Sequence, residues 1–258
     1  MILYGDPKVG KSYAALQLAL ALAGDGSGDW LGFPTRKQTG SVVYVQLDTP
    51  RSLWAERLED LKAAGRPVES DRFYLADRET LGTWPFDILN PDHEQLLRAA
   101  LAPIKPVAVI IDTLKESNTA QENDNTEMTS AINKLISATQ PAALIIVAHS
   151  KKPTFEVEPD LIQDTRGASA IVGKMDAICR MTKKGLYYTG RAIEQGSIKL
   201  QREDDGFWSI FDDGLEGMVV EVMADSTLTS LRAKAVVLAT RAGIKEEAAR
   251  SILRRRSG

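Results

Sequence analysis

Residues 5–12 read GDPKVGKS, between the apolar run 1–4 and the alanine- and leucine-rich run 13–23 (YAALQLALALA). The spacing G-x-x-x-x-G-K-[ST] is typical of a strand, a tight loop and the start of a helix. Gly5 and Gly10 let the backbone curl so that successive N–H groups point inward and form a nest for an anion. The positive end of the helix dipole adds to this nest. The stretch therefore predicts a nucleotide phosphate site between a buried strand and a helix.

The side chains of this loop have separate expected roles. Lys11 is expected to reach the β- and γ-phosphates of ATP, and the Ser12 hydroxyl is expected to ligate Mg²⁺. The whole loop is expected to contact the nucleotide, so the predicted binding residues are Gly5, Asp6, Pro7, Lys8, Val9, Gly10, Lys11, Ser12 and Tyr13.

Three further apolar runs are rich in β-branched residues and lie at 41–48 (SVVYVQLD), 107–112 (VAVIID) and 142–150 (AALIIVAHS). Such runs are typical of strands that are buried on both faces of a parallel sheet. Helical stretches at 53–65, 92–102 and 127–140 alternate with them. The alternation predicts an α/β fold with a mostly parallel twisted sheet flanked by helices.

The polar ends of these runs are candidate site residues. Ligands of open α/β sheets bind at the carboxyl ends of the strands. We therefore expect Asp48, Asp112 and His149 at the same edge as the phosphate loop. Two long polar stretches, 114–126 and 150–166, leave from this edge and are expected to be functional loops.

After residue 185 the chain changes to short, partly alternating segments at 186–193, 197–204 and 207–213. This pattern predicts antiparallel strands that extend one edge of the sheet. From residue 227 the sequence favours helices. We expect one large nucleotide-binding domain over residues 1–223 and a small helical appendage over 224–258, which is either a helix-turn-helix or two helices packed on the core.

The composition limits the class of protein. The 258 residues include 43% hydrophobic and 26% charged residues, and the net charge is −3. No apolar run reaches the roughly 20 residues of a membrane helix. The single cysteine, Cys179, leaves no intrachain disulfide and no cysteine-rich zinc site. We expect a cytoplasmic protein with no membrane partner, whose nucleic-acid binding is limited to a local patch.

Asp112 ends an apolar strand, where P-loop NTPases carry the aspartate on the magnesium side. Hydrolysis also needs a group that orients or deprotonates water. Because Thr113 follows Asp112, the candidate for this group is Asp48 on the neighbouring strand, with Glu116 and Glu122 as the next choices. His149 is interpreted either as a group near the γ-phosphate or as a structural residue at a strand end.

These residues, together with 164–181 (DTRGASAIVGKMDAICRM), resemble the RecA-like P-loop ATPases. The order of the motifs and the RGAS segment at 166–169 are most similar to the RepA-type hexameric replicative helicases and their phage relatives. The resemblance covers residues 1 to about 210.

The resemblance implies a role for each motif. Lys11 and Ser12 would bind phosphate and Mg²⁺, and Asp112 would be the Walker B acid. Asp48 would be the catalytic carboxylate, although the family usually has Glu at this position, which implies slower hydrolysis or a bridging water. His149 would sense the γ-phosphate.

The same resemblance implies contacts outside the subunit. Arg166 would be an arginine finger inserted into the site of the next subunit. Independently of the resemblance, Lys151 and Lys152 in the segment that leads to Arg166 are either solvated loop charges or contacts for DNA phosphates, and Phe155 is a candidate contact for a base. The acidic residues at 156, 158 and 160 argue against this DNA contact, because they would repel the backbone.

The resemblance implies a Mg²⁺-dependent ATPase of a prokaryotic or phage-infected cell. It would assemble into a hexameric ring or a filament and act on single-stranded DNA with replication or recombination proteins. A replicative helicase is the first interpretation, and a phage-type recombinase or single-strand annealing ATPase is the alternative. A kinase and a DNA-independent oligomeric ATPase scaffold are two further classes.

Overall fold

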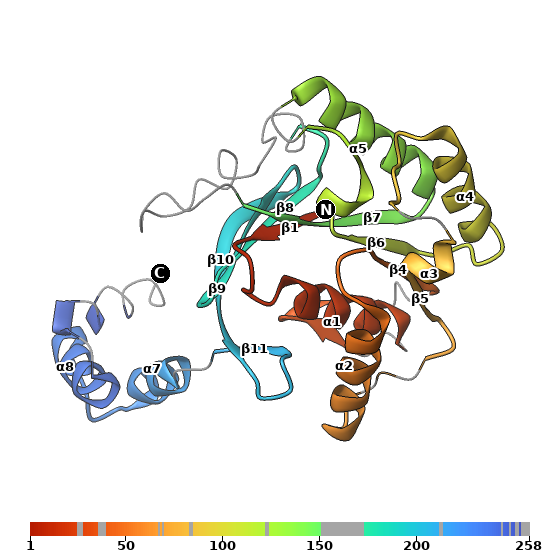
Figure 1. Cartoon of the computed structure of the whole chain (residues 1–258). Coiled ribbons are helices and arrows are strands. Elements are labelled where there is room, and N and C mark those ends of the chain that lie inside the picture. The colour runs from red at the N-terminus through yellow and green to blue at the C-terminus, as the bar shows by residue number, and fades with distance from the viewer. Residues whose placement is uncertain are drawn as a thin grey trace. The chain divides into compact units, whose positions relative to one another are not determined.

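The structure is a computed structural model, and it describes residues 1–24, 28–35, 40–66, 68, 70–82, 85–121, 124–150, 173–211, 214–243, 245–247, 249–250 and 253 (Figure 1). The chain divides into two compact units, Met1–Ile210 and Phe211–Gly258. No helix in these described ranges is long and apolar enough to cross a membrane.

Within the described residues, the first unit contains a nine-stranded sheet in the order β11-β10-β9-β8-β1-β7-β6-β4-β5. Its parallel strands are β1 (Ile2–Gly5), β4 (Val42–Gln46), β5 (Phe73–Asp77), β6 (Ala108–Asp112), β7 (Ala143–His149) and β8 (Ala177–Met181). The antiparallel extension consists of β9 (Gly185–Gly190), β10 (Ile193–Arg202) and β11 (Trp208–Ile210). The predicted α/β fold with antiparallel edge strands is confirmed.

The strand of the phosphate loop lies in the middle of the sheet. β1 is fully buried and pairs in parallel with β7 on one side and β8 on the other. Gly5 lies opposite His149, and Asp112 lies opposite Gln46 of β4. The carboxyl ends of β1, β4, β6 and β7 therefore meet at one edge, as the sequence predicts.

Helices cover both faces of this sheet (Figure 1). α1 (Lys11–Ala23) packs on one face, where alternate strand residues such as Leu3 and Tyr44 share its core. α4 (Pro91–Leu101) and α5 (Asn125–Thr139) pack on the other face with the intervening residues, such as Ile2 and Val45. Both faces of the strands are therefore apolar, which explains their near-continuous apolar sequences.

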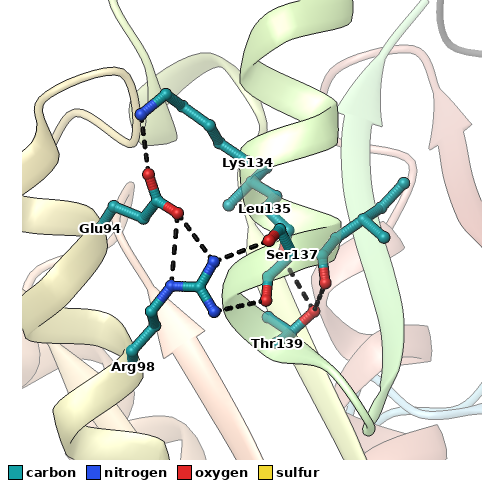
Figure 2. A network of polar contacts seen from close by, with 7 residues as sticks. Glu94, Arg98, Lys134, Leu135, Ser137 and Thr139 are labelled. Carbon is teal, nitrogen blue, oxygen red and sulfur yellow. Dashed lines mark hydrogen bonds and ion pairs between the residues drawn. The ribbon is translucent and has the colours of Figure 1, made fainter.

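Polar contacts join α4 to α5 on the second face. Glu94 accepts hydrogen bonds from Lys134 at 2.7 Å and from Arg98 at 2.8 Å. Arg98 also donates to the carbonyl and hydroxyl oxygens of Ser137, both at 2.7 Å (Figure 2). The cluster fixes the two helices against each other.

Several short elements differ from the prediction. The hairpin β2 (Asp29–Trp30) and β3 (Phe33–Pro34), the edge strand β5 and α3 (Arg78–Leu81) have no counterpart in the sequence analysis. The 3₁₀ helix η1 (Lys115–Ser117) lies in a stretch that the sequence predicts to be a loop. α2 (Arg51–Ala63) begins two residues before its predicted start at residue 53.

The second unit has its own small core. α7 (Leu215–Ala224) places Val219 and Val222 against Ala235 and Leu238 of α8 (Leu231–Ala242). The division at residue 210 therefore leaves α7 with the C-terminal unit, whereas the boundary predicted at residue 223 placed it with the first domain.

Candidate nucleotide-binding site

A cleft of about 350 Å³ opens at the carboxyl edge of the parallel strands. It is lined by Lys8, Gly10, Lys11, Ser12, Tyr13, Asp48, Arg57, Asp112, Thr113, Val147, His149 and Arg202. The structure thus brings together eight residues that the sequence predicted from four separate segments: Lys8, Gly10, Lys11, Ser12 and Tyr13 of the phosphate loop, with Asp48, Asp112 and His149.

A larger cleft of about 1010 Å³ lies elsewhere in the first unit, and its described lining contains none of the predicted site residues. Two of the cations that line it are already bonded within the chain. Arg66 pairs with Asp205 at 2.6 Å, and Arg72 donates to the carbonyl oxygen of Gly24. We therefore assign the chemistry to the smaller cleft.

The two glycines of the phosphate loop are required by close contacts. A Cβ on Gly5 would lie 2.2 Å from the carbonyl oxygen of Met181 on β8. Gly10 precedes α1 with a φ of +84°, and a Cβ on this residue would lie 2.9 Å from the indole nitrogen of Trp208. The loop therefore needs glycine at both positions to curl between β1 and α1.

Lys11 is 5% exposed and bends back over the loop. Its amine donates to the carbonyl oxygens of Gly5 at 3.0 Å and Asp6 at 2.8 Å, and it lies 3.3 Å from Nδ1 of His149. Burial lowers the pKa of Lys11 to about 8, although the charges of Asp112, Asp6 and Asp48 oppose this shift. The amine and the imidazole therefore share one end of the cleft.

Asp112 is a buried carboxylate at the end of β6. Its Oδ2 accepts a hydrogen bond from the Tyr44 hydroxyl at 2.6 Å, and Oδ1 has no hydrogen-bond partner among the described residues. Burial raises the pKa of Asp112, while hydrogen bonds from Tyr44 and Ser12 and the charge of Lys11 lower it. One carboxylate oxygen of Asp112 is thus without a hydrogen-bond partner in a cleft that Ser12 also lines.

This donor set fits Mg²⁺ bound with a nucleotide. Mg²⁺ is usually held by one or two protein oxygens together with substrate phosphates and waters. Asp112 and Ser12 supply such oxygens. No group of three or more His, Cys, Asp or Glu side chains that could hold a metal by itself occurs among the residues that the structure describes.

Asp48 lies two residues beyond the end of β4, and its side chain is exposed at the cleft. The preceding residue is anchored to the Asp112 strand, because the N–H of Leu47 donates to the carbonyl oxygen of Asp112 at 2.7 Å. The two carboxylates therefore come from adjacent strands, with the buried one suited to a cation and the exposed one suited to orienting water.

Two charged residues of the cleft, Arg57 and Arg202, were missed by the sequence analysis. Arg57 of α2 and Arg202 of β10 place their guanidinium carbons 4.4 Å and 4.9 Å from the centre of the Tyr13 ring. Arg57 also lies 4.7 Å from the Trp54 ring, and its buried Nη1 has no hydrogen-bond partner among the described residues. Only the fold brings these two arginines to the phosphate loop, so no motif spacing could have revealed them.

The charges of the cleft favour a polyanionic ligand. Among the residues that the structure describes, four that line the cleft are cationic: Lys8, Lys11, Arg57 and Arg202. Two described lining residues, Asp48 and Asp112, are acidic. The excess of positive charge suits a triphosphate, and the two acids suit its cation and the attacking water.

Comparison with protein families agrees with this geometry. Residues 1–154 match the family described as AAA domain. The chain belongs to this AAA domain family. The matched region of the AAA domain contains Lys11, Asp48, Asp112 and His149, and it ends before Arg166.

Comparison with solved structures confirms the fold of the AAA domain. One similar structure is the KaiC-like protein PH0186 from Pyrococcus horikoshii OT3, with a TM-score of 0.51 and 11% sequence identity. The similarity covers 81% of this chain and 88% of that chain. No curated protein sequence matches the chain. The family match shows an AAA domain, and the structural similarity shows the predicted RecA-like fold, while the RepA-type assignment stays a prediction.

Some predicted site residues lie outside the residues that the structure describes. These are Arg166, Lys151, Lys152, Phe155 and the alternative acid Glu122. Their proposed roles stay predictions. The other alternative acid, Glu116, lies in η1 with its Oε2 3.9 Å from Nη2 of Arg78.

The environment of Lys11 predicts a pH dependence of nucleotide binding. A bound phosphate chain would raise the lowered pKa of this amine, because negative charge favours its protonated form. The affinity for ATP should therefore be highest below about pH 8. Above this pH it should fall by up to about tenfold per pH unit. Calorimetry in two buffers with different ionisation enthalpies would measure the proton taken up on binding.

The control for this measurement is Lys11→Arg, because a guanidinium stays charged throughout this range. Whatever its affinity, this variant should show no proton uptake from position 11. An unchanged affinity of the unaltered protein between about pH 7 and about pH 9.5 would contradict the assignment.

Proposed function

We propose that the chain hydrolyses ATP with Mg²⁺ in this cleft and uses the reaction to act on DNA as a RepA-like hexameric replicative helicase. The observation that carries the hydrolysis is the gathering of Lys11, Asp48, Asp112 and His149 around one cavity. The order of the motifs and the RGAS segment at 166–169 support the helicase.

Each described residue has a part in the proposed reaction. Bound Mg²⁺ and ATP would supply the electrophilic γ-phosphorus and a cation that offsets phosphate charge. Lys11 would exchange its carbonyl partners for phosphate oxygens, while Ser12 and the free oxygen of Asp112 would hold the ion. Asp48 would orient the attacking water and receive its proton. His149, beside the Lys11 amine, would report whether the terminal phosphate is present.

The proposed assembly is a homo-oligomer, either a hexameric ring or a filament. Arg166 would enter the cleft of the next subunit and stabilise charge in the transition state. Lys151 and Lys152 would contact phosphates of single-stranded DNA, and Phe155 would stack on a base. The sequence resemblance supports the role of Arg166. The DNA contacts are supported by the position of their segment in the sequence, between His149 and Arg166. All four residues lie outside the described ranges.

A strand-displacement assay tests the proposal. The intact chain is incubated with ATP, Mg²⁺ and a forked duplex, and Lys11→Ala serves as the control without phosphate binding. ATP-dependent release of one strand, lost in the control, would support the helicase. Pairing of complementary single strands without displacement would instead support the recombinase or annealing alternative.

A DNA-independent oligomeric ATPase is a second candidate. The net charge of −3 favours it, because the chain as a whole does not attract nucleic acid. ATP hydrolysis without displacement, annealing or DNA binding would support this candidate. Transfer of phosphate to a small-molecule acceptor, in place of release as inorganic phosphate, would identify a kinase.

A further inference from the structure

The segment 47–51, which carries Asp48 from β4 to α2, is anchored at both ends. At the first end, the carbonyl oxygen of Leu47 accepts a hydrogen bond from Nε of Arg78 at 2.5 Å. At the other end, Arg51 donates to both carboxylate oxygens of Asp77, with Nη2 2.6 Å from Oδ1. The exposed Asp48 thus lies between two fixed points.

The two residues that hold this segment, Asp77 and Arg78, are consecutive and lie at the end of the edge strand β5. Asp77 is the last residue of β5, and Arg78 is the first residue of α3. Asp77 is 7% exposed and also accepts from the N–H and hydroxyl groups of Thr80, both at 2.8 Å. The hydrogen bond from Arg51 holds the pKa of Asp77 well below its usual range. A charge-assisted pair of this kind is a rigid support.

Arg78 also faces the segment that follows the Walker B acid. Its Nη2 lies 3.9 Å from Oε2 of Glu116 in η1. Arg78 does not line the cleft. It therefore contacts both segments that leave β4 and β6, at Leu47, the residue before Asp48, and at Glu116, four residues after Asp112.

We propose that Arg78 is a positioning residue, which fixes the Leu47 carbonyl and thereby holds the Asp48 carboxylate at the cleft. The inference rests on the proposed catalytic role of Asp48. Because the Asp48 side chain is exposed, surrounding packing does not hold it, and the main chain on either side of it sets the point from which the side chain extends. A displacement of about 1 Å in a reacting group can lower a rate by about 10²-fold.

The test compares Arg78→Ala with the unaltered chain in steady-state ATPase assays. We expect kcat to fall by about 10- to 100-fold while KM for ATP stays within about twofold, because the phosphate and metal ligands are unchanged. Arg78→Lys, which keeps a cationic donor, should recover part of the rate. A purely structural role would instead lower the melting temperature and the active fraction without this separation of kcat from KM.

Arg98→Ala is a matched control. Arg98 also donates to a main-chain carbonyl oxygen, that of Ser137, and pairs with a glutamate, Glu94, but it lies on α4 and does not line the cleft (Figure 2). The side chains are similarly exposed, at 44% for Arg98 and 37% for Arg78. Arg98→Ala should leave kcat unchanged. An equal fall of kcat in both variants would overturn the inference.

A double-mutant cycle separates this inference from the proposed function. If Arg78 acts through Asp48, Arg78→Ala should cause no further loss of rate in an Asp48→Asn chain. Losses that multiply in the double variant would overturn the positioning role and leave Asp48 as the acid. An Asp48→Asn chain with an unchanged rate would overturn the proposed acid itself, and the positioning role with it.

Discussion

Replacing Arg166 with alanine is expected to lower the ATPase rate by about 10³- to 10⁵-fold, which is the contribution of an arginine finger to phosphoryl transfer. The guanidinium would act on charge that develops only in the transition state. ATP binding should therefore change little, because the phosphate loop of each subunit is intact. Steady-state hydrolysis and equilibrium binding of ATP measure the two effects separately.

The same residue predicts complementation between two inactive chains. In a mixed assembly, an Arg166→Ala chain keeps a working phosphate loop, and a Lys11→Ala chain can supply its arginine. Mixing the two should restore part of the activity at those interfaces. If native mass measurement shows mixed assemblies and no activity returns, Arg166 does not act between subunits.

Replacing Asp48 with asparagine is expected to reduce kcat by about 10²- to 10⁴-fold, the usual contribution of a general base. Asparagine keeps the size of the side chain but removes the charge that would orient water. Affinity for ATP should persist, because Lys11, Ser12 and Asp112 are unaltered. Single-turnover hydrolysis with saturating ATP measures the chemical step directly.

Asp48→Glu is the matched control for this substitution. The helicases that the sequence resembles usually have Glu here, so the longer carboxylate should retain turnover. A rate near that of the unaltered chain for Asp48→Asn would show that another acid is used. Glu116, which belongs to η1 and lies beside Arg78 of α3, would be the next candidate.

The central strands were predictable because of their burial. β4, β6 and most of β7 are buried on both faces, so their sequences are continuous apolar runs. β5 lies at the edge of the sheet, and its residues FYLAD are mostly half-buried or exposed. An edge strand lacks the continuous apolar signal, so β5, α3 and hence the contact of Arg78 with Leu47 emerged only from the fold.

The candidate site also contains residues that the sequence predicts and residues that only the fold reveals. Lys11 and Ser12 belong to a local motif whose spacing is fixed by the loop, and Asp112 follows a buried strand. Arg57 and Arg202 are far apart in the sequence, and they meet at the Tyr13 ring because α2 and the end of β10 converge there. Their approach depends on tertiary packing rather than on any local pattern.

The domain boundary could not be predicted from the sequence either. α7 is an apolar segment, LEGMVVEVMA, directly after the antiparallel strands. Its sequence alone does not indicate whether it packs on the sheet or on the helices that follow. The core formed by Val219, Val222, Ala235 and Leu238 places it with the C-terminal unit.

The rate of ATP hydrolysis by the intact chain, measured with and without single-stranded DNA, tests the central claim most directly. A DNA-acting ATPase should hydrolyse ATP faster when DNA is present, and Lys11→Ala should abolish both the basal and the stimulated rate. Identical rates with and without DNA, from a chain that native mass measurement shows to be assembled, would contradict the proposed action on DNA.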